Sequence, residues 1–271
     1  MPTLTKLVAA MFSIAALAGV CQAQKPAETI DLSDFPAQSI DEVVVPVPSE
    51  VFIVLDKLGN PNWRGEQREF LGKQTANRAQ VALLLGTVIA EGFVAVEAED
   101  PERVKEIGRR VLALSKAINV EKAVLERAKS ITDKAEVKDW QAVRKEFDGA
   151  LQDVKGAMTE LGDDELAQLV SVGGWIRGTE VLTSIVRKTY TADSAELLHQ
   201  PVLLDYFSKR LSDLSNTRLA NDRLVVLIRK SLKDIRPLIG DEDGSKIPLE
   251  NVQRIHQLTR DLVGSITSQG A

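Results

Sequence analysis

The stretch that decides the fold is VALLLGTVIAEGFVAV, residues 81–96, in which Glu91 is the single charge. A helix that crosses a bilayer needs about 20 mainly apolar residues, so this run is too short and is also interrupted by a carboxylate. On a helical wheel, Gln80, Thr87 and Glu91 fall within an arc of about 40° on a helix that is otherwise apolar all round. The sequence therefore predicts a buried core helix with one narrow polar seam.

The polar seam suggests two interpretations of its carboxylate. We expect Glu91 to reach the solvent edge or a polar partner, and a ligand-binding carboxylate is the alternative. Arg177 lies in a second apolar helix and follows a nearly uncharged stretch, so we expect it to be partly buried. A buried arginine requires a carboxylate partner, for which Glu91 and Glu180 are the candidates. A structural ion pair and an anion-binding arginine both fit this pattern.

Small residues share one face of each of these two helices. The stripes are Ala79, Ala82, Gly86 and Ala90 in the first helix, and Ala167, Ser171, Gly174 and Gly178 in the second. A glycine inside a helix costs about 1 kcal/mol relative to alanine, and close packing of two helices compensates for that cost. We therefore predict that the helices cross near Gly86 and Gly174. A shift of 88 residues superposes the two segments, which suggests a duplicated hairpin (62–118 and 164–214), with chance similarity as the alternative.

Capping residues and helix breakers divide the chain from Ser49 onward into eight or nine helices, with no convincing strand. The expected helices are 50–58, 62–99, 101–118, a segment capped by Asn119, 134–161, 164–189, a segment opened by Thr191 and restarted at Pro201, 217–235, and 248–265. This pattern predicts an all-α fold, an antiparallel bundle of helical hairpins in a single domain, 49–271. Residues 24–48 contain prolines and lack helical periodicity, so we expect a flexible or extended leader.

Two groups of residues have simple structural interpretations. The charges of segment 101–118, among them Arg103, are spaced as ion pairs on a solvated helix face. Trp63, Trp140 and Trp175 are expected in the core or at helix junctions.

The first 23 residues have the features of an export signal. Lys6 supplies the positive charge, residues 7–20 form the apolar run, and Cys21-Gln22-Ala23 places small residues before a cut at Gln24. A retained N-terminal anchor is the alternative. Cleavage after Ala23 removes the only cysteine, so the exported chain has no disulfide, thiolate ligand or cysteine nucleophile. We expect a periplasmic or secreted protein without a transmembrane span in its mature chain.

The net charge and the residue types present exclude several classes of function. The net charge is −5, and it becomes −6 once Lys6 is removed. Mild acidity without a block of basic residues argues against a nucleic-acid partner. No serine lies in a nucleophile-elbow pattern, and with two histidines a catalytic triad is hard to assemble. These features favour a non-enzymatic binding or scaffolding module of the bacterial envelope, with a protein or small-molecule partner.

The alternative is a small-molecule or metal-binding protein, or an enzyme, with a polar site in the bundle core. Its candidate residues are Glu91, Arg177, Glu180 and His199. Glu196 and His199 have the Glu-x-x-His spacing of di-iron bundles, but such a site needs that pair twice. We therefore expect His199 to be a surface or capping residue.

The segment IGDEDGSKIPLE, residues 239–250, resembles the calcium loop of EF-hand proteins. The resemblance implies that Asp241, Asp243 and Glu250 occupy ligand positions 3, 5 and 12. Ile239 stands at the first position, where an aspartate is usual. The favoured interpretation is therefore an acidic turn between helices, and calcium is the only cofactor that the sequence suggests.

Overall fold

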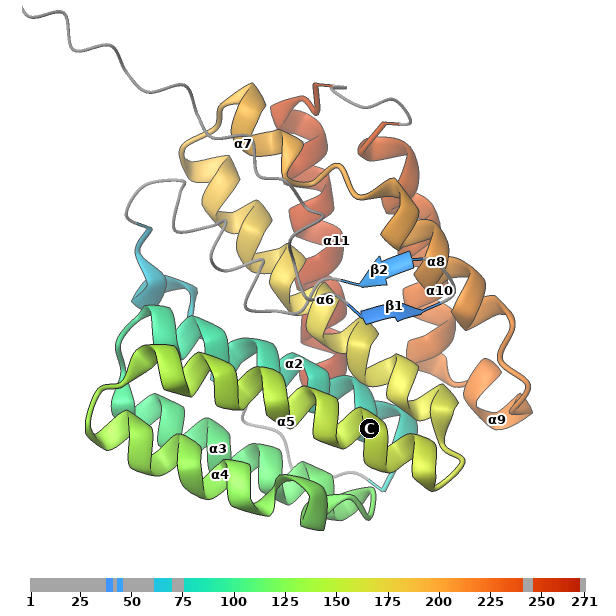
Figure 1. Cartoon of the computed structure of the whole chain (residues 1–271). Helices are drawn as coiled ribbons and strands as arrows, with labels where there is room; N and C mark the ends of the chain where they lie inside the picture. The colour runs from blue at the N-terminus through green and yellow to red at the C-terminus, as the bar shows by residue number, and fades with distance from the viewer. Residues whose placement is uncertain (1–37, 41–42, 46–60, 70–75, 241–245, 269–271) are drawn as a thin grey trace, which may run out of the picture. The chain divides into compact units, whose positions relative to one another are not determined.

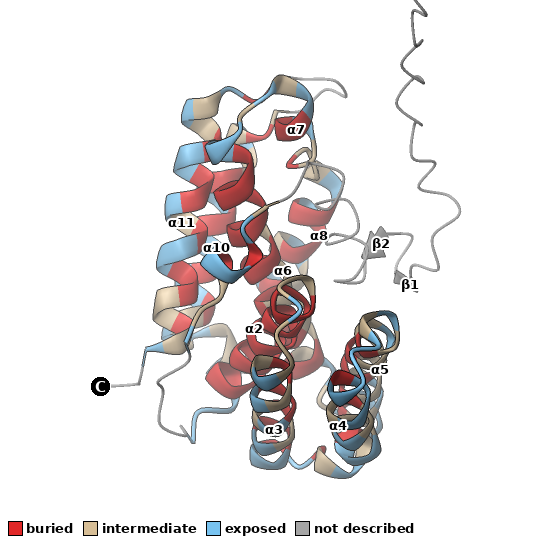
Figure 2. Cartoon of the chain, turned by 90° about the vertical axis from the view of Figure 1, so that its left-hand side faces the viewer, coloured by how far each residue is buried: buried red, intermediate tan, exposed pale blue. Residues whose placement is uncertain are grey.

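The central helix of the fold begins at Asn77, whose side chain accepts a hydrogen bond of 3.0 Å from the backbone N–H of Gln80. Helix α2 then runs over Arg78–Glu97, and every residue in 79–96 is buried (Figure 2). In the computed structural model, residues 38–40, 43–45, 61–69, 76–240 and 246–268 are described. Among these, α2 is the one helix long and apolar enough to cross a membrane, and its apolar window is entirely buried inside the protein. The expectation of a core helix is confirmed.

Apart from one short hairpin, the other regular elements of the described chain are all helices. The helices are η2 (Trp63–Glu66), α3 (Pro101–Ala117), α4 (Glu121–Glu136), α5 (Trp140–Glu160), α6 (Asp164–Lys188), α7 (Ala192–Glu196), α8 (Pro201–Ser212), α9 (Thr217–Ala220), α10 (Arg223–Ile235), η3 (Arg236–Leu238) and α11 (Leu249–Thr267). Strands β1 (Gln38–Ile40) and β2 (Val43–Val45) pair antiparallel within the segment that we expected to be an extended leader. The all-α class is confirmed.

Helices α2 and α6 form the centre of the packing. Helices α3, α4 and α5 follow α2, each in contact with the one before, and α5 also contacts α2 (Figure 1). The most extensive contact of α2 is with α6, which in turn packs against α11. Helix α10 packs against α8 and α11. Trp63 is buried, and Trp140 and Trp175 pack partly buried against the core, as expected.

Glycines allow α2 and α6 to touch through their backbones. A Cβ atom added to Gly86 would lie 1.9 Å from the carbonyl oxygen of Val170, and one added to Gly173 would lie 2.1 Å from that of Leu83. Real Cβ atoms never approach a backbone oxygen so closely, so both positions require glycine. The predicted crossing near Gly86 and Gly174 is confirmed. However, Gly173 makes the tighter contact, and a Cβ on Gly178 would meet no atom within 4 Å.

Several predicted helix boundaries are wrong because a different side chain provides the cap. The expected helix 62–99 is interrupted, since η2 ends at Glu66, Gln67 is extended (ψ 142°) and Asn77 starts α2. Residues 133–136 do not open a helix but lie within α4. Asp139 caps α5 instead, accepting a hydrogen bond of 3.1 Å from the N–H of Ala142.

Two more boundaries differ from the prediction, and five agree with it. Asn119 does not cap α4; it adopts a left-handed conformation (φ 67°), and the helix begins one residue after Val120. The expected helix 217–235 is divided at residues 221–222, where Asp222 caps α10. The agreeing boundaries are Asp100, Gly162, Thr191, Pro201 and Pro248.

Part of the prediction concerns residues outside the described ranges. These are the export signal 1–23, the leader residues 24–37, the helix 50–58, and the calcium-loop residues Asp241 and Asp243. All described residues belong to one unit, 37–271. The duplication of segments 62–118 and 164–214 stays a prediction.

Candidate functional site

Three of the four residues that the sequence singled out come together between α2 and α6. Glu91 of α2 and Arg177 and Glu180 of α6 are at most 2% exposed. Arg68, which precedes α2, and Arg103 of α3 complete the group, and these five residues are called here the buried charge cluster. Thr87 and Glu91 of the polar seam face α6, while Gln80 donates to the carbonyls of Ile266 and Ser268 at the end of α11. The polar-partner interpretation of Glu91 is therefore correct and the solvent-edge interpretation is wrong.

Arg177 pairs with both carboxylates of the cluster. Its Nε and Nη2 atoms donate to Oε2 of Glu91 at 2.9 and 2.7 Å, and its Nη1 atom donates to Oε2 of Glu180 at 2.8 Å. Nη2 also donates to the backbone carbonyl of Glu66. The expected pairing of Arg177 is confirmed with both carboxylates at once.

The segment before α2 closes the cluster. The backbone N–H of Arg68 donates to Oε1 of Glu91 at 2.7 Å, and its guanidinium donates to Oε1 of Glu180. Arg103 donates to the carbonyl of Arg68 and lies 3.8 Å from Oε1 of Glu91. The Glu66 side chain accepts from Lys188 of α6. The cluster therefore ties residues 66–68 to three helices.

These contacts pair both buried carboxylates with donors of the protein itself. Burial raises the pKa of Glu91, while Arg177 and the N–H of Arg68 act to lower it. Burial acts to lower the pKa of Arg177, but Glu91 and Glu180 outweigh this effect and raise it. Every polar contact of Glu91 is with a donor, so we assign Glu91 as a carboxylate. Each of the four carboxylate oxygens already accepts a hydrogen bond, so the cluster is built as a structural ion network.

The sequence interpretation missed three members of this region. Arg103 was expected on a solvated face, but its side chain is only 12% exposed. Arg103 lies four residues before the buried Ile107, so both occupy the inward face of α3, and this spacing could have predicted the burial of Arg103 from the sequence. Glu66 and Arg68 carry no such periodic signal, because Glu66 ends the single turn of η2 and Arg68 lies between η2 and α2.

His256 of α11 borders the cluster and was also missed as a partner. Its Nδ1 atom lies 3.2 Å from the hydroxyl oxygen of Thr183, one turn beyond Glu180 on α6. Burial lowers the pKa of His256, and the nearby Arg187 lowers it further, against the opposing effect of Glu180. His256 is therefore a neutral packing residue near physiological pH.

The fourth candidate, His199, lies elsewhere. Helix α7 ends at Glu196, so His199 does not share a helical face with that residue. Its Nδ1 atom donates to the carbonyl of Ile239 at 2.8 Å, while Glu196 is exposed. Within the described ranges, no group of three His, Cys, Asp or Glu residues has the geometry to hold a metal ion. The expected capping role of His199 agrees with its contact to a backbone carbonyl.

The calcium-like loop is described only at its two ends. Ile239 is buried, and its carbonyl is the acceptor for His199. Glu250 lies exposed in the first turn of α11. Asp241 and Asp243 are outside the described residues, so calcium binding stays a prediction.

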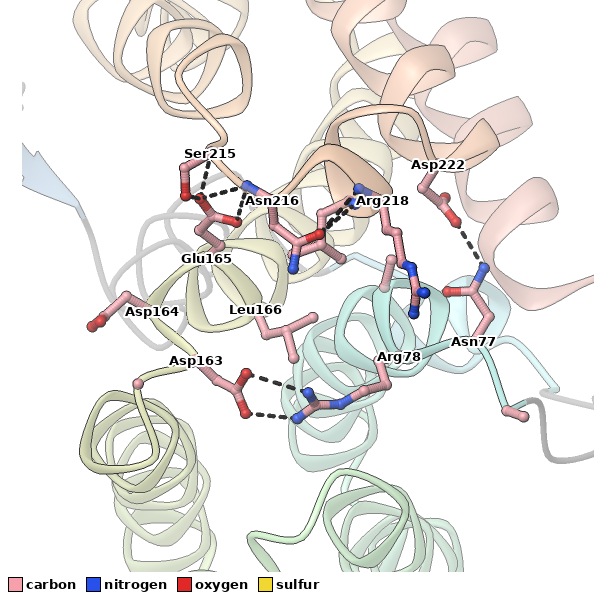
Figure 3. Close-up of a pocket in the computed structure, with 14 residues that line it drawn as sticks. Asn77, Arg78, Asp163, Asp164, Glu165, Leu166, Ser215, Asn216, Arg218 and Asp222 are labelled. Atoms are coloured by element: carbon pink, nitrogen blue, oxygen red, sulfur yellow. Dashed lines mark hydrogen bonds and ion pairs between the residues drawn. The ribbon is translucent and has the colours of Figure 1, made fainter.

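A separate cleft of about 780 Å³ lies where residues 76–79, 162–166 and 215–222 meet. Ala79, Leu166 and Leu219 give it an apolar part. Around them are the starts of α2, α6 and α10, which bring polar side chains to the same opening (Figure 3). The buried charge cluster does not line this cleft. A second cavity near Trp175 has about 10 Å³ and is too small for a ligand.

Ion pairs and hydrogen bonds hold the walls of this cleft in place. Arg78 and Asp163 form a two-pronged pair at 2.6 and 3.3 Å. Glu165 accepts hydrogen bonds of 2.6 Å from both the N–H and the hydroxyl of Ser215. Although partial burial acts to raise the pKa of Glu165, these hydrogen bonds lower it. The α6 start is therefore fixed to the turn before α9.

Two charged side chains at the cleft are exposed and able to pair with a bound partner. Arg218 of α9 is exposed and extends toward the start of α2 (Figure 3). Asp164, at the α6 edge of the cleft, is also exposed. Neither has an ion-pair partner among the residues that the structure describes. The cleft thus offers one cation, one anion and a small apolar surface to a partner.

Comparisons with protein-family models, with curated proteins and with solved structures gave no match to this chain.

Proposed function

We propose that the chain is an exported helical protein of the bacterial cell envelope that acts as a binding or scaffolding module. The observation that carries this proposal is the cleft of about 780 Å³ at the starts of α2, α6 and α10. A volume of this size falls within the usual range of ligand sites. The export signal predicted for residues 1–23 supports the location, and the proposal includes an antiparallel arrangement of helical hairpins that presents the cleft.

The chemistry of the cleft suggests the class of partner. Arg218 suits a carboxylate of the partner, and Asp164 suits an amine or amide. Leu166 and Leu219 add a small apolar contact. A short polar peptide segment carries all three kinds of group, so we propose a protein partner that inserts such a segment.

The second candidate is a ligand, metal or catalytic site in the bundle core. The convergence of Glu91, Arg177 and Glu180 favours it, since buried titratable groups often mark such sites. Their mutual pairing argues against it, because each carboxylate oxygen already accepts a hydrogen bond. We therefore prefer the cleft, and we propose that the chain is not an enzyme.

The test compares partners captured from the native envelope by four forms of the protein. These are the wild type, Arg218→Glu, Ser215→Trp, and the control Lys145→Glu, which changes an exposed residue of α5 away from the cleft. We expect one partner to be retained by the wild type and the control and reduced at least about tenfold by both cleft variants, a loss of 1.4 kcal/mol or more in affinity. A set of partners that is the same for all four forms contradicts the proposal, and so does the capture of none.

Calcium regulation through residues 239–250 is a separate proposal. A calcium site on the folded protein raises the melting temperature when the ion is added. An unchanged melting temperature at millimolar calcium removes this proposal and leaves the cleft proposal intact.

A further inference from the structure

The exposed face of α10 is unusual in carrying almost only positive charge. The helix packs against its neighbours through Val225, Ile228, Leu232 and Ile235. Its opposite face is exposed and carries Arg223, Arg229, Lys230 and Lys233, with Asp234 as the single acid. We call these four cations the α10 basic face. The burial pattern of the helix is visible in Figure 2.

Among the residues that the structure describes, one of these four cations has an ion-pair partner. Lys230 forms an exposed pair with Asp234 at 3.2 Å. Arg223, Arg229 and Lys233 have no ion-pair partner within the described part of the chain. By contrast, the exposed Arg78 at the start of α2 pairs with Asp163 at 2.6 Å. The α10 basic face is therefore a local excess of positive charge on a protein whose net charge is −5.

Two apolar side chains lie among these cations. Val226 is 49% exposed and Leu227 is 36% exposed. At 100° per residue, Val226 falls between Lys233 and Lys230 on the helical wheel. Lysine and arginine place their charged ends in water or among headgroups while their stems lie along apolar surface. A cluster of four or more lysines and arginines on an amphipathic helix is typical of a surface that binds anionic lipid headgroups.

We propose that the α10 basic face docks on a bilayer that contains anionic phospholipids, with the helix axis along the membrane plane. The 13 residues of α10 extend over about 20 Å and present a straight face to a flat surface. The net negative charge of the chain does not prevent this, because charges more than about 8 Å from the membrane are largely screened at physiological salt. This inference does not depend on the cleft.

Charge carries more of the docking than apolar insertion does, because Val226 and Leu227 are already half-buried or more. Each lysine or arginine near an anionic surface contributes about fivefold to the partition coefficient. Neutralising three cations therefore weakens binding to anionic vesicles by about a hundredfold. The binding is also expected to weaken at high salt.

The test measures co-flotation of the full chain with vesicles of phosphatidylcholine alone or with 30% phosphatidylglycerol. The measured quantity is the ratio of the anionic to the neutral partition coefficient, because the apolar residues 7–20, where retained, act on both vesicle types alike. The test variant is Arg229→Gln/Lys230→Gln/Lys233→Gln. The control variant, Lys122→Gln/Lys129→Gln/Lys145→Gln, removes the same charge from exposed positions of α4 and α5.

The expected ratio is well above 10 for the wild type and the control and close to 1 for the α10 variant, all three with the same melting temperature. A wild-type ratio close to 1 overturns the proposal. It is also overturned if the α10 variant keeps the wild-type ratio, or if the control loses it as fully, since net charge and not the α10 basic face then governs binding.

Discussion

Replacing Arg177 by methionine should cost about 3–5 kcal/mol of unfolding free energy, because it leaves buried charges without their partner. Arg177 lies between Glu91 and Glu180, 2.7 and 2.8 Å from their nearest oxygens. Without it, Glu180 keeps Arg68, but the fully buried Glu91 keeps only the more distant Arg103, at 3.8 Å, among its cationic partners in the cluster, and the carbonyl of Glu66 loses a donor. A typical domain is stable by about 5–15 kcal/mol, so this loss is a large fraction of the total.

The double variant Glu91→Leu/Arg177→Met separates the loss of the charge pair from general damage to the core. It removes one negative and one positive charge and leaves Glu180 paired with Arg68. We therefore expect it to be destabilised by at least about 1 kcal/mol less than the sum of the two single variants, as contacting residues in one network usually are.

The assay is urea unfolding of the full chain, followed by far-UV circular dichroism and by tryptophan fluorescence. Coincident transitions allow a free energy to be extracted. The control is Asp234→Asn, which breaks an exposed pair and should cost less than about 0.5 kcal/mol. The reasoning is refuted if Arg177→Met costs less than about 1 kcal/mol with an unchanged urea slope, or if the double variant is additive.

Three further outcomes are expected. Gly86→Ala should destabilise the protein by about 1–3 kcal/mol in urea unfolding, because the added Cβ would lie 1.9 Å from the Val170 carbonyl oxygen. The control Gly178→Ala should be neutral or stabilising by up to about 1 kcal/mol, because its Cβ meets no atom within 4 Å. Equal costs for the two variants would contradict the close crossing of α2 and α6. Burial lowers the pKa of His256, so the contribution of the neutral imidazole to stability is complete above the ordinary histidine pKa of about 6.5 and declines as the pH falls from there toward the folded pKa. The unfolding free energy should therefore decline more between about pH 7 and about pH 5 in the wild type than in His256→Gln. Equal declines in the two proteins would contradict this role of His256. Because the pKa of Glu165 is lowered, its carboxylate contributes to stability at pH values above the ordinary glutamate pKa, and this contribution is lost as the pH falls through the folded pKa. Glu165→Gln should therefore cost about 0.5–1.5 kcal/mol of unfolding free energy at neutral pH and nothing in strong acid. A cost that persists in acid would show that the carboxylate charge is not responsible.

The fold class and the helix crossing were accessible from sequence because both depend on local features. Apolar periodicity identified α2 and α6, and glycine spacing identified their contact face at Gly86. Helix starts were predicted correctly where the cap is a standard pair such as Asp100-Pro101. The start expected at residue 134 was wrong, because residues 133–136 continue α4 and Asp139 caps α5 instead.

The chain alone determined that a nearly charge-free helix lies in the core, that an arginine of a second apolar helix needs a carboxylate, and that small residues bring these helices together. Tertiary structure decided which charges meet and where a cleft opens. Arg177 and Glu91 are 86 residues apart, and Arg68 and Glu180 are 112 residues apart. Periodicity specifies the face of a helix that a residue occupies but not the partner that the face meets, since that choice follows from how distant helices cross. The cleft has the same origin, because its walls come from three segments that only the folded chain places side by side.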